Sequence, residues 1–107
     1  SHDKKLCEKY AKDPMVFKTT TARWATEFFA KGDEILENAG RLKVPTLLLL
    51  AGDDKLVKME ANREFAKKVT EKDFQMKLYD GFYHELLNEV EKDKVFRDVD
   101  AWLKPRI

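Results

Sequence analysis

The chain has 107 residues, which is enough for one small domain but not for two. Charged residues make up 38% of the chain, yet 21 Lys and Arg nearly balance 20 Asp and Glu. Since binding of nucleic acid or of an anionic membrane needs a strongly basic surface, this balance argues against a nucleic-acid partner and against a polybasic membrane anchor.

Residues 1–18 are polar with scattered apolar side chains, and Asp13-Pro14 predicts a turn there. A helix is predicted over residues 20–40, where apolar side chains recur at helical spacing. The threonines at 19–21 can cap the start of this helix, and Gly40 is placed to end it.

Residues 44–51, "VPTLLLLA", form the clearest predicted strand of the chain. The run is apolar without alternation, which is typical of a strand that is covered on both faces. Pro45 at its start and the Gly52-Asp53-Asp54 turn at its end favour a strand over a helix. Residues 74–79, "FQMKLY", alternate apolar and polar side chains, which predicts a second strand with one face in water.

Two further helices are predicted, one between the strands and one that Pro105 ends near the C-terminus. The order helix, strand, helix, strand, helix predicts an α/β fold with parallel strands and right-handed crossovers. Two parallel strands make a poor sheet by themselves, and the first strand lacks a partner at one edge. We therefore interpret the sequence as the end of a doubly wound α/β domain that is incomplete without its N-terminal part.

Chemistry-bearing residues follow both predicted strands. In open α/β sheets, sites form just beyond the carboxyl ends of the strands, where Asp53, Asp54 and, after the second strand, His84 are found. Neighbouring strands lie about 4.8 Å apart, so an acid in the first loop can reach the imidazole in the second. An Asp beside a His would orient a general base and stabilise its imidazolium form. Taken singly, an Asp-rich loop is usually a turn and a lone His a surface residue, so these patterns alone leave both interpretations open.

Three segments, "VPTLLLLAGDDKLV", "LYDGFYHELLNE" and "VFRDVDAWL", together resemble the C-terminal third of a group of α/β-hydrolases. This is the monoacylglycerol lipase and lysophospholipase group, in the S33 serine-aminopeptidase-like or hydrolase 4 branch. The resemblance implies that residues 1–43 are the end of a lid region and the helix leading back to the sheet. It implies that residues 44–107 are the last two β-α units of the hydrolase core.

The resemblance also implies roles for single residues. Asp54 matches the acid of a catalytic triad, with Asp53 as the alternative one position earlier, and His84 matches the base. Three residues match the segment after that base, where we expect them to fix the loop: Glu85, Asn88 and Glu89.

The sequence contains no G-x-S-x-G motif and no HG-type oxyanion loop, and its single serine is Ser1. We therefore expect the chain to supply the triad Asp and His of a serine hydrolase acting on carboxylic esters, and to be inactive alone. The expected partner is the N-terminal part of the same fold, which carries the nucleophile, with a lipid ester as substrate. The alternative is a non-catalytic fragment of a hydrolase homologue that self-associates, as a homodimer for example, or binds a ligand.

The remaining side chains predict neither a metal site nor a cofactor. His2 and His84 are far apart in sequence, Cys7 is the single cysteine, and no His-x-x-x-His or Cys-x-x-Cys pair occurs. Ser1-His2 can also be interpreted as a tag remnant. The lone cysteine fits a reducing compartment, and the polar start contains no signal peptide, so we expect a cytoplasmic protein that can associate with membranes.

Overall fold

The computed structural model describes residues 1–107 and contains four helices and two strands. In chain order these are α1 (Lys4–Lys12), α2 (Ala22–Asn38), β1 (Thr46–Ala51), α3 (Met59–Lys68), β2 (Phe74–Tyr79) and α4 (Lys92–Leu103). Three short 3-10 turns join or follow them: η1 (Ala39–Arg41), η2 (Leu86–Asn88) and η3 (Lys104–Arg106).

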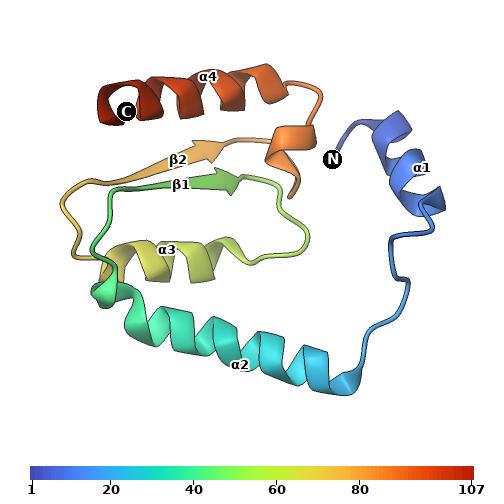
Figure 1. The fold of residues 1–107 in the computed structure, drawn as a ribbon, viewed down its shortest axis with the longest axis horizontal. Helices are drawn as coiled ribbons and strands as arrows, with labels where there is room; N and C mark the ends of the chain where they lie inside the picture. Colours follow the sequence, from blue (N-terminus) through green and yellow to red (C-terminus); the bar gives the residue numbers. More distant parts are fainter.

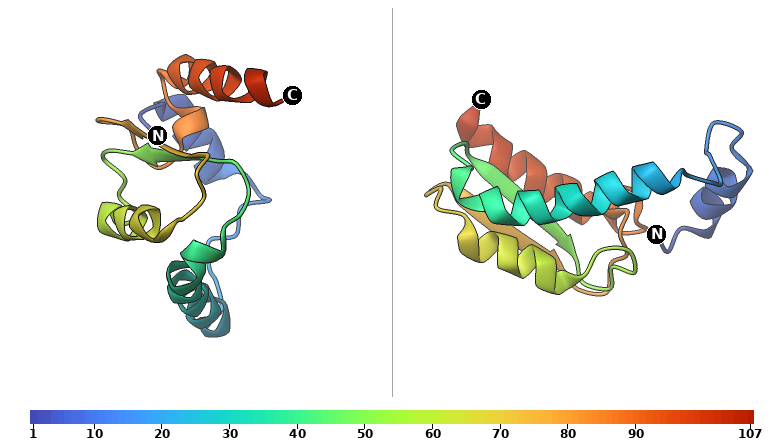
Figure 2. Two further views of the ribbon diagram at one scale, coloured as in Figure 1. Left: turned by 90° about the vertical axis from the view of Figure 1, so that its left-hand side faces the viewer. Right: turned by 90° about the horizontal axis from the view of Figure 1, so that it is seen from below.

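The two strands pair in parallel, with Thr46 opposite Phe74 and Ala51 opposite Tyr79. Helix α4 covers one face of this sheet, and α3 and α2 lie on the other (Figures 1 and 2). Both strands point toward the side of the molecule where the N-terminus and α1 lie (Figure 1). The predicted α/β fold with parallel strands is confirmed.

The helix ends follow the local sequence signals. The Thr21 hydroxyl accepts a hydrogen bond from the backbone N–H of Trp24, so α2 begins at Ala22. The α-helical geometry ends at Asn38, two residues before the expected end, and Gly40 lies in η1. A Cβ atom at position 40 would lie 3.3 Å from the backbone oxygen of Lys68, which explains a glycine there.

Helix α1 is an element that the sequence analysis did not predict. The Asp3 carboxylate caps its start by accepting from the N–H of Leu6 at 3.0 Å, and it ends before the predicted Asp13-Pro14 turn. The signal was present, because Leu6 and Tyr10 are spaced four residues apart behind a capping Asp. This helical signal was overlooked because the segment is rich in lysine and has few apolar residues.

The hydrophobic core lies at the carboxyl ends of the strands. One buried cluster joins the strand ends to α4 and consists of Ala51, Tyr79, Phe82 and, from α4, Val95. Seven of the 107 residues are buried, and α1, α2 and α3 contain none of them. Residues 46–49 of β1, predicted to be covered on both faces, are half-buried here, because the sheet has two strands and one edge of β1 is unpaired. The chain therefore forms part of a sheet, and its helices bury the faces of that sheet only in part.

Candidate active site

The two loops that carry the expected site residues are joined by backbone hydrogen bonds. Beyond the ladder, the N–H of Gly52 donates to the carbonyl of Tyr79 at 2.8 Å, and the N–H of Asp53 donates to the carbonyl of Phe82 at 2.9 Å. A Cβ atom on residue 52 would lie 2.9 Å from the Cα of Asp80, so only glycine permits this approach. The parallel register thus places the Asp loop and the His loop side by side.

His84 and Asp54 meet across these loops. The ring Nδ1 of His84 lies 2.9 Å from Oδ2 of Asp54. The other carboxylate oxygen of Asp54 accepts from the backbone N–H groups of Leu56 at 2.8 Å and Val57 at 3.0 Å. One oxygen therefore fixes the carboxylate to its own loop, and the other fixes the imidazole.

Electrostatics keep this carboxylate ionised. Burial alone would raise the pKa of Asp54, but hydrogen bonds from His84 and from two backbone N–H groups hold it below the ordinary value of 3.8. Attraction to the imidazole acts in the same direction. An ionised Asp that accepts from Nδ1 selects the tautomer in which Nε2 can take up a proton, which is the arrangement a general base needs.

A pocket of about 530 Å³ opens beside His84, between the two loops and α1. Helix α1 contributes Leu6, Cys7 and Tyr10 to its lining, and the loops contribute Leu56, Tyr83 and His84. The side chain of Asp54 is 11% exposed, whereas that of His84 is 41% exposed and faces this space. The imidazole is thus the member of the pair that a bound molecule can reach.

The other residues expected at the site have different roles in the structure. Asp53, the alternative acid, has an exposed side chain and contributes its backbone to the loop contact, so the structure favours Asp54 as the partner of His84. The side chain of Glu85 accepts only from the side-chain amide of Asn88, while Glu89 accepts from the N–H of Tyr83 and so holds the His loop. Sequence reasoning missed the pocket wall that α1 provides.

Metal ligands do not gather anywhere in the structure, since no group of three or more His, Cys, Asp or Glu side chains is arranged to hold an ion. None of the helices combines the length and the apolar character that crossing a membrane requires.

Comparisons with known proteins identify relatives of the chain. The chain is 31% identical over 96% of its length to a monoacylglycerol lipase of Mycolicibacterium smegmatis, and 30% identical over 84% to the phospholipase YtpA of Bacillus subtilis. It superposes on a crystal structure of a Paleococcus ferrophilus monoacylglycerol lipase with a TM-score of 0.88 and 26% identity over 96% of the chain. The chain spans only 37%, 35% and 40% of these three proteins, respectively.

The family model described as serine aminopeptidase, S33 (hydrolase 4) matches residues 1–91. The match extends from the start of the chain through both strands and the loops that carry Asp54 and His84. The chain therefore belongs to this family and corresponds to a C-terminal portion of an α/β-hydrolase of the monoacylglycerol lipase type.

Proposed function

We propose that Asp54 and His84 are the acid and base of a catalytic triad whose serine lies in the part of the fold outside this chain. The single observation that carries the proposal is the 2.9 Å contact between His84 Nδ1 and Asp54 Oδ2 at the ends of two adjacent parallel strands. We call the chain together with the nucleophile-bearing part of the fold the assembled hydrolase.

The proposed substrates are carboxylic esters of lipids. Two of the relatives are named as lipases of monoacylglycerol and one as a phospholipase. The pocket beside His84 suits an amphipathic molecule, because Leu6, Tyr10 and Leu56 line it together with charged side chains such as Lys9 and Lys55.

The chemistry proceeds in two stages. The serine hydroxyl adds to the ester carbonyl while its proton passes to Nε2 of His84, and the tetrahedral intermediate then expels the alcohol, which takes that proton. In the second stage, water attacks the acyl-enzyme, His84 again accepts a proton, and it returns that proton to the serine as the carboxylic acid leaves. Asp54 stays ionised throughout and stabilises the imidazolium form of His84.

The partner we propose is the N-terminal part of the same fold, bound along the free edge of β1. This edge belongs to the strand with the continuous leucine run, whereas β2 alternates with polar residues such as Gln75 and Lys77. A strand that is apolar on both faces suits the interior of a sheet. Self-association through the same edge is the competing possibility.

Co-expression decides between these partners. Light scattering after size exclusion should show a one-to-one complex of this chain with the nucleophile-bearing part. A stable homodimer that does not bind that part would favour the non-catalytic alternative.

The experiment that tests the function compares ester hydrolysis by the assembled hydrolase and by the chain alone. We expect turnover of p-nitrophenyl esters by the assembled hydrolase and none by the chain. His84→Ala should lower kcat by roughly 10³-fold or more. Leu87→Ala is the matched control, because Leu87 lies three residues away in η2, is 49% exposed and does not line the pocket. Turnover by the chain alone that disappears in His84→Ala would overturn the proposal of a missing nucleophile.

A further inference from the structure

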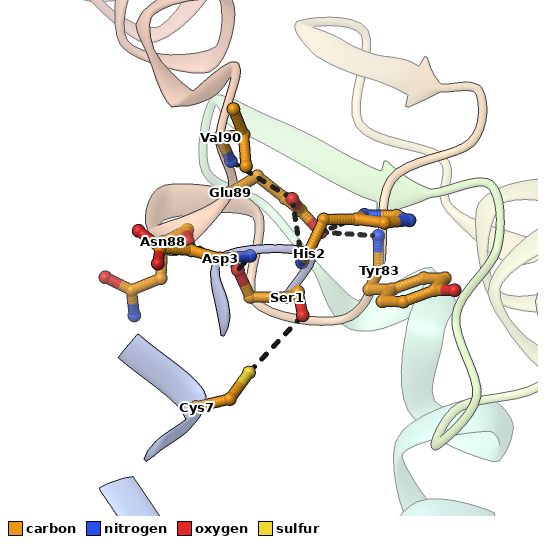
Figure 3. Close-up of polar contacts among 8 residues, drawn as sticks. All are labelled: Ser1, His2, Asp3, Cys7, Tyr83, Asn88, Glu89 and Val90. Atoms are coloured by element: carbon orange, nitrogen blue, oxygen red, sulfur yellow. Dashed lines mark hydrogen bonds and ion pairs between the residues drawn. The ribbon is translucent and has the colours of Figure 1, made fainter. Parts of the chain in front are cut away.

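Glu89 is the one charged residue of the chain that is buried, at 3% exposure. A buried carboxylate is costly unless hydrogen-bond donors surround it. Oε1 of Glu89 accepts from the N–H of Tyr83 at 3.1 Å, and Oε2 accepts from the N–H of Val90 at 3.1 Å. The backbone N–H of His2 lies 3.1 Å from both oxygens, and the ring Nδ1 of His2 lies 3.0 Å from Oε1 (Figure 3).

These donors come from three separate segments of the chain. Tyr83 belongs to the His84 loop, Val90 leads into α4, and His2 lies two residues before the start of α1. The ring of His2 also stacks on the ring of Tyr83, with centroids 3.7 Å apart and planes inclined by 21°. The carboxylate of Glu89 therefore binds both the first residues of the chain and the His84 loop (Figure 3).

Two further contacts secure the same junction. The Ser1 hydroxyl donates to the carbonyl of Asn88 at 2.7 Å and accepts from the N–H of Asp3 at 3.0 Å. Asp3 in turn caps α1. Hydrogen bonds, together with the backbone between neighbouring residues, thus connect Glu89 to the start of α1.

We propose that Glu89, His2 and Tyr83 form a clamp that sets the position of the His84 backbone and of α1 on opposite sides of the pocket. Glu89 is a positioning residue in this clamp, because it acts on His84 through the adjacent Tyr83 N–H and touches no reacting atom. The proposal rests on the function assigned to Asp54 and His84. It adds an acid and a second histidine, 87 residues apart, on which the placement of the base depends.

Few other hydrogen bonds hold Tyr83 and His84 in place. The Phe82 carbonyl accepts from the N–H of Asp53, and the Tyr83 N–H donates to Glu89. The side chain of His84 has a single hydrogen-bond partner, Asp54. Burial alone would raise the pKa of Glu89, yet its donors lower that pKa to about 2, so the carboxylate is ionised at neutral pH.

Glu89→Gln in the assembled hydrolase tests the clamp. The substitution keeps the size of the side chain but places an NH₂ group, which cannot accept, among N–H donors. We expect hydrogen exchange in the segment of residues 81–88 to accelerate by about tenfold and kcat per active site to fall by about tenfold. The proton resonance of the His84–Asp54 hydrogen bond should broaden, which a loss of stability elsewhere would not cause.

Glu91→Gln is the matched control, since Glu91 lies two residues away, is exposed, and contacts only Lys94. Exchange or kcat in Glu89→Gln that matches this control would overturn the clamp, as would faster exchange with an unchanged kcat.

A second variant tests the clamp if Glu89→Gln does not fold. His2→Phe keeps an aromatic ring that can stack on Tyr83 and removes both ring nitrogens, including the Nδ1 that contacts Glu89. It should show smaller changes of the same sign. Values equal to wild type would overturn the proposal. An assembled hydrolase whose activity survives His84→Ala refutes the proposed function instead, while the exchange measurement still shows whether Glu89 holds the loop.

Discussion

Acidification from pH 7 to pH 3 should weaken the fold through Glu89. Burial raises the pKa of this carboxyl, but the donors of His2, Tyr83 and Val90 outweigh burial and lower the pKa from 4.5 to about 2 in the folded chain. Because the folded pKa lies below the unfolded value, the stabilisation is complete above pH 4.5 and is lost as the pH falls toward 2.

The size of the effect follows from the two pKa values. At 1.36 kcal/mol per unit, a shift from 4.5 to about 2 corresponds to about 3 kcal/mol in the free energy of unfolding at pH 7. Linkage between protonation and folding then places a loss of about 2 kcal/mol between pH 7 and pH 3. Little of this is screened by solvent, because Glu89 is only 3% exposed.

Urea unfolding of the assembled hydrolase, followed by tryptophan fluorescence at both pH values, measures this loss. Wild type and the control Glu91→Gln should each lose about 2 kcal/mol more between pH 7 and pH 3 than Glu89→Gln does. The other acids with a lowered pKa, including Asp54 and Asp98, are present in all three proteins, so their contributions cancel. An identical pH dependence in Glu89→Gln and wild type would refute this reasoning.

Further substitutions test the packing around the site, each measured by chemical denaturation. Val95 is fully buried, so Val95→Ala should lower the unfolding free energy by roughly 2 kcal/mol, whereas the exposed Val90→Ala should change it by less than about 0.5 kcal/mol. Gly52→Ala should cost about 1–3 kcal/mol and lower activity, because its Cβ would meet the Asp80 backbone. Gly32→Ala, in an open part of α2, should instead stabilise by up to about 1 kcal/mol. Equal effects within either pair would contradict the packing described.

The elements that position the site were predictable because their signals are local. The leucine run between Pro45 and Gly52 indicates a strand, and parallel strands bring their carboxyl ends to one edge of the sheet. The strands alone indicate that an acid of the first loop can reach His84, and the choice of Asp54 came from the family resemblance. The structure places Oδ2 of Asp54 2.9 Å from Nδ1 of His84.

The features that the sequence did not reveal are those that depend on distant contacts. Nothing in the pattern around His2 indicates that it pairs with Glu89, 87 residues away, and a His at the start of a chain resembles a tag remnant. Glu89 was expected to fix the loop, but its burial could not be inferred from a position between Asn88 and Val90 with a second acid, Glu91, close by. Its contacts with His2 exist only once the first residues of the chain and the His84 loop come together.

In the proposed triad, Asp54, rather than its neighbour Asp53, supports His84 as a catalytic base. The most direct test is kcat for ester hydrolysis by the assembled hydrolase carrying Asp54→Asn or Asp53→Asn. Asp54→Asn should lower kcat on the order of 10³–10⁴-fold by favouring the wrong tautomer of His84, and Asp53→Asn should stay within a few fold of wild type. Equal losses in the two variants, or a larger loss in Asp53→Asn, would contradict the account.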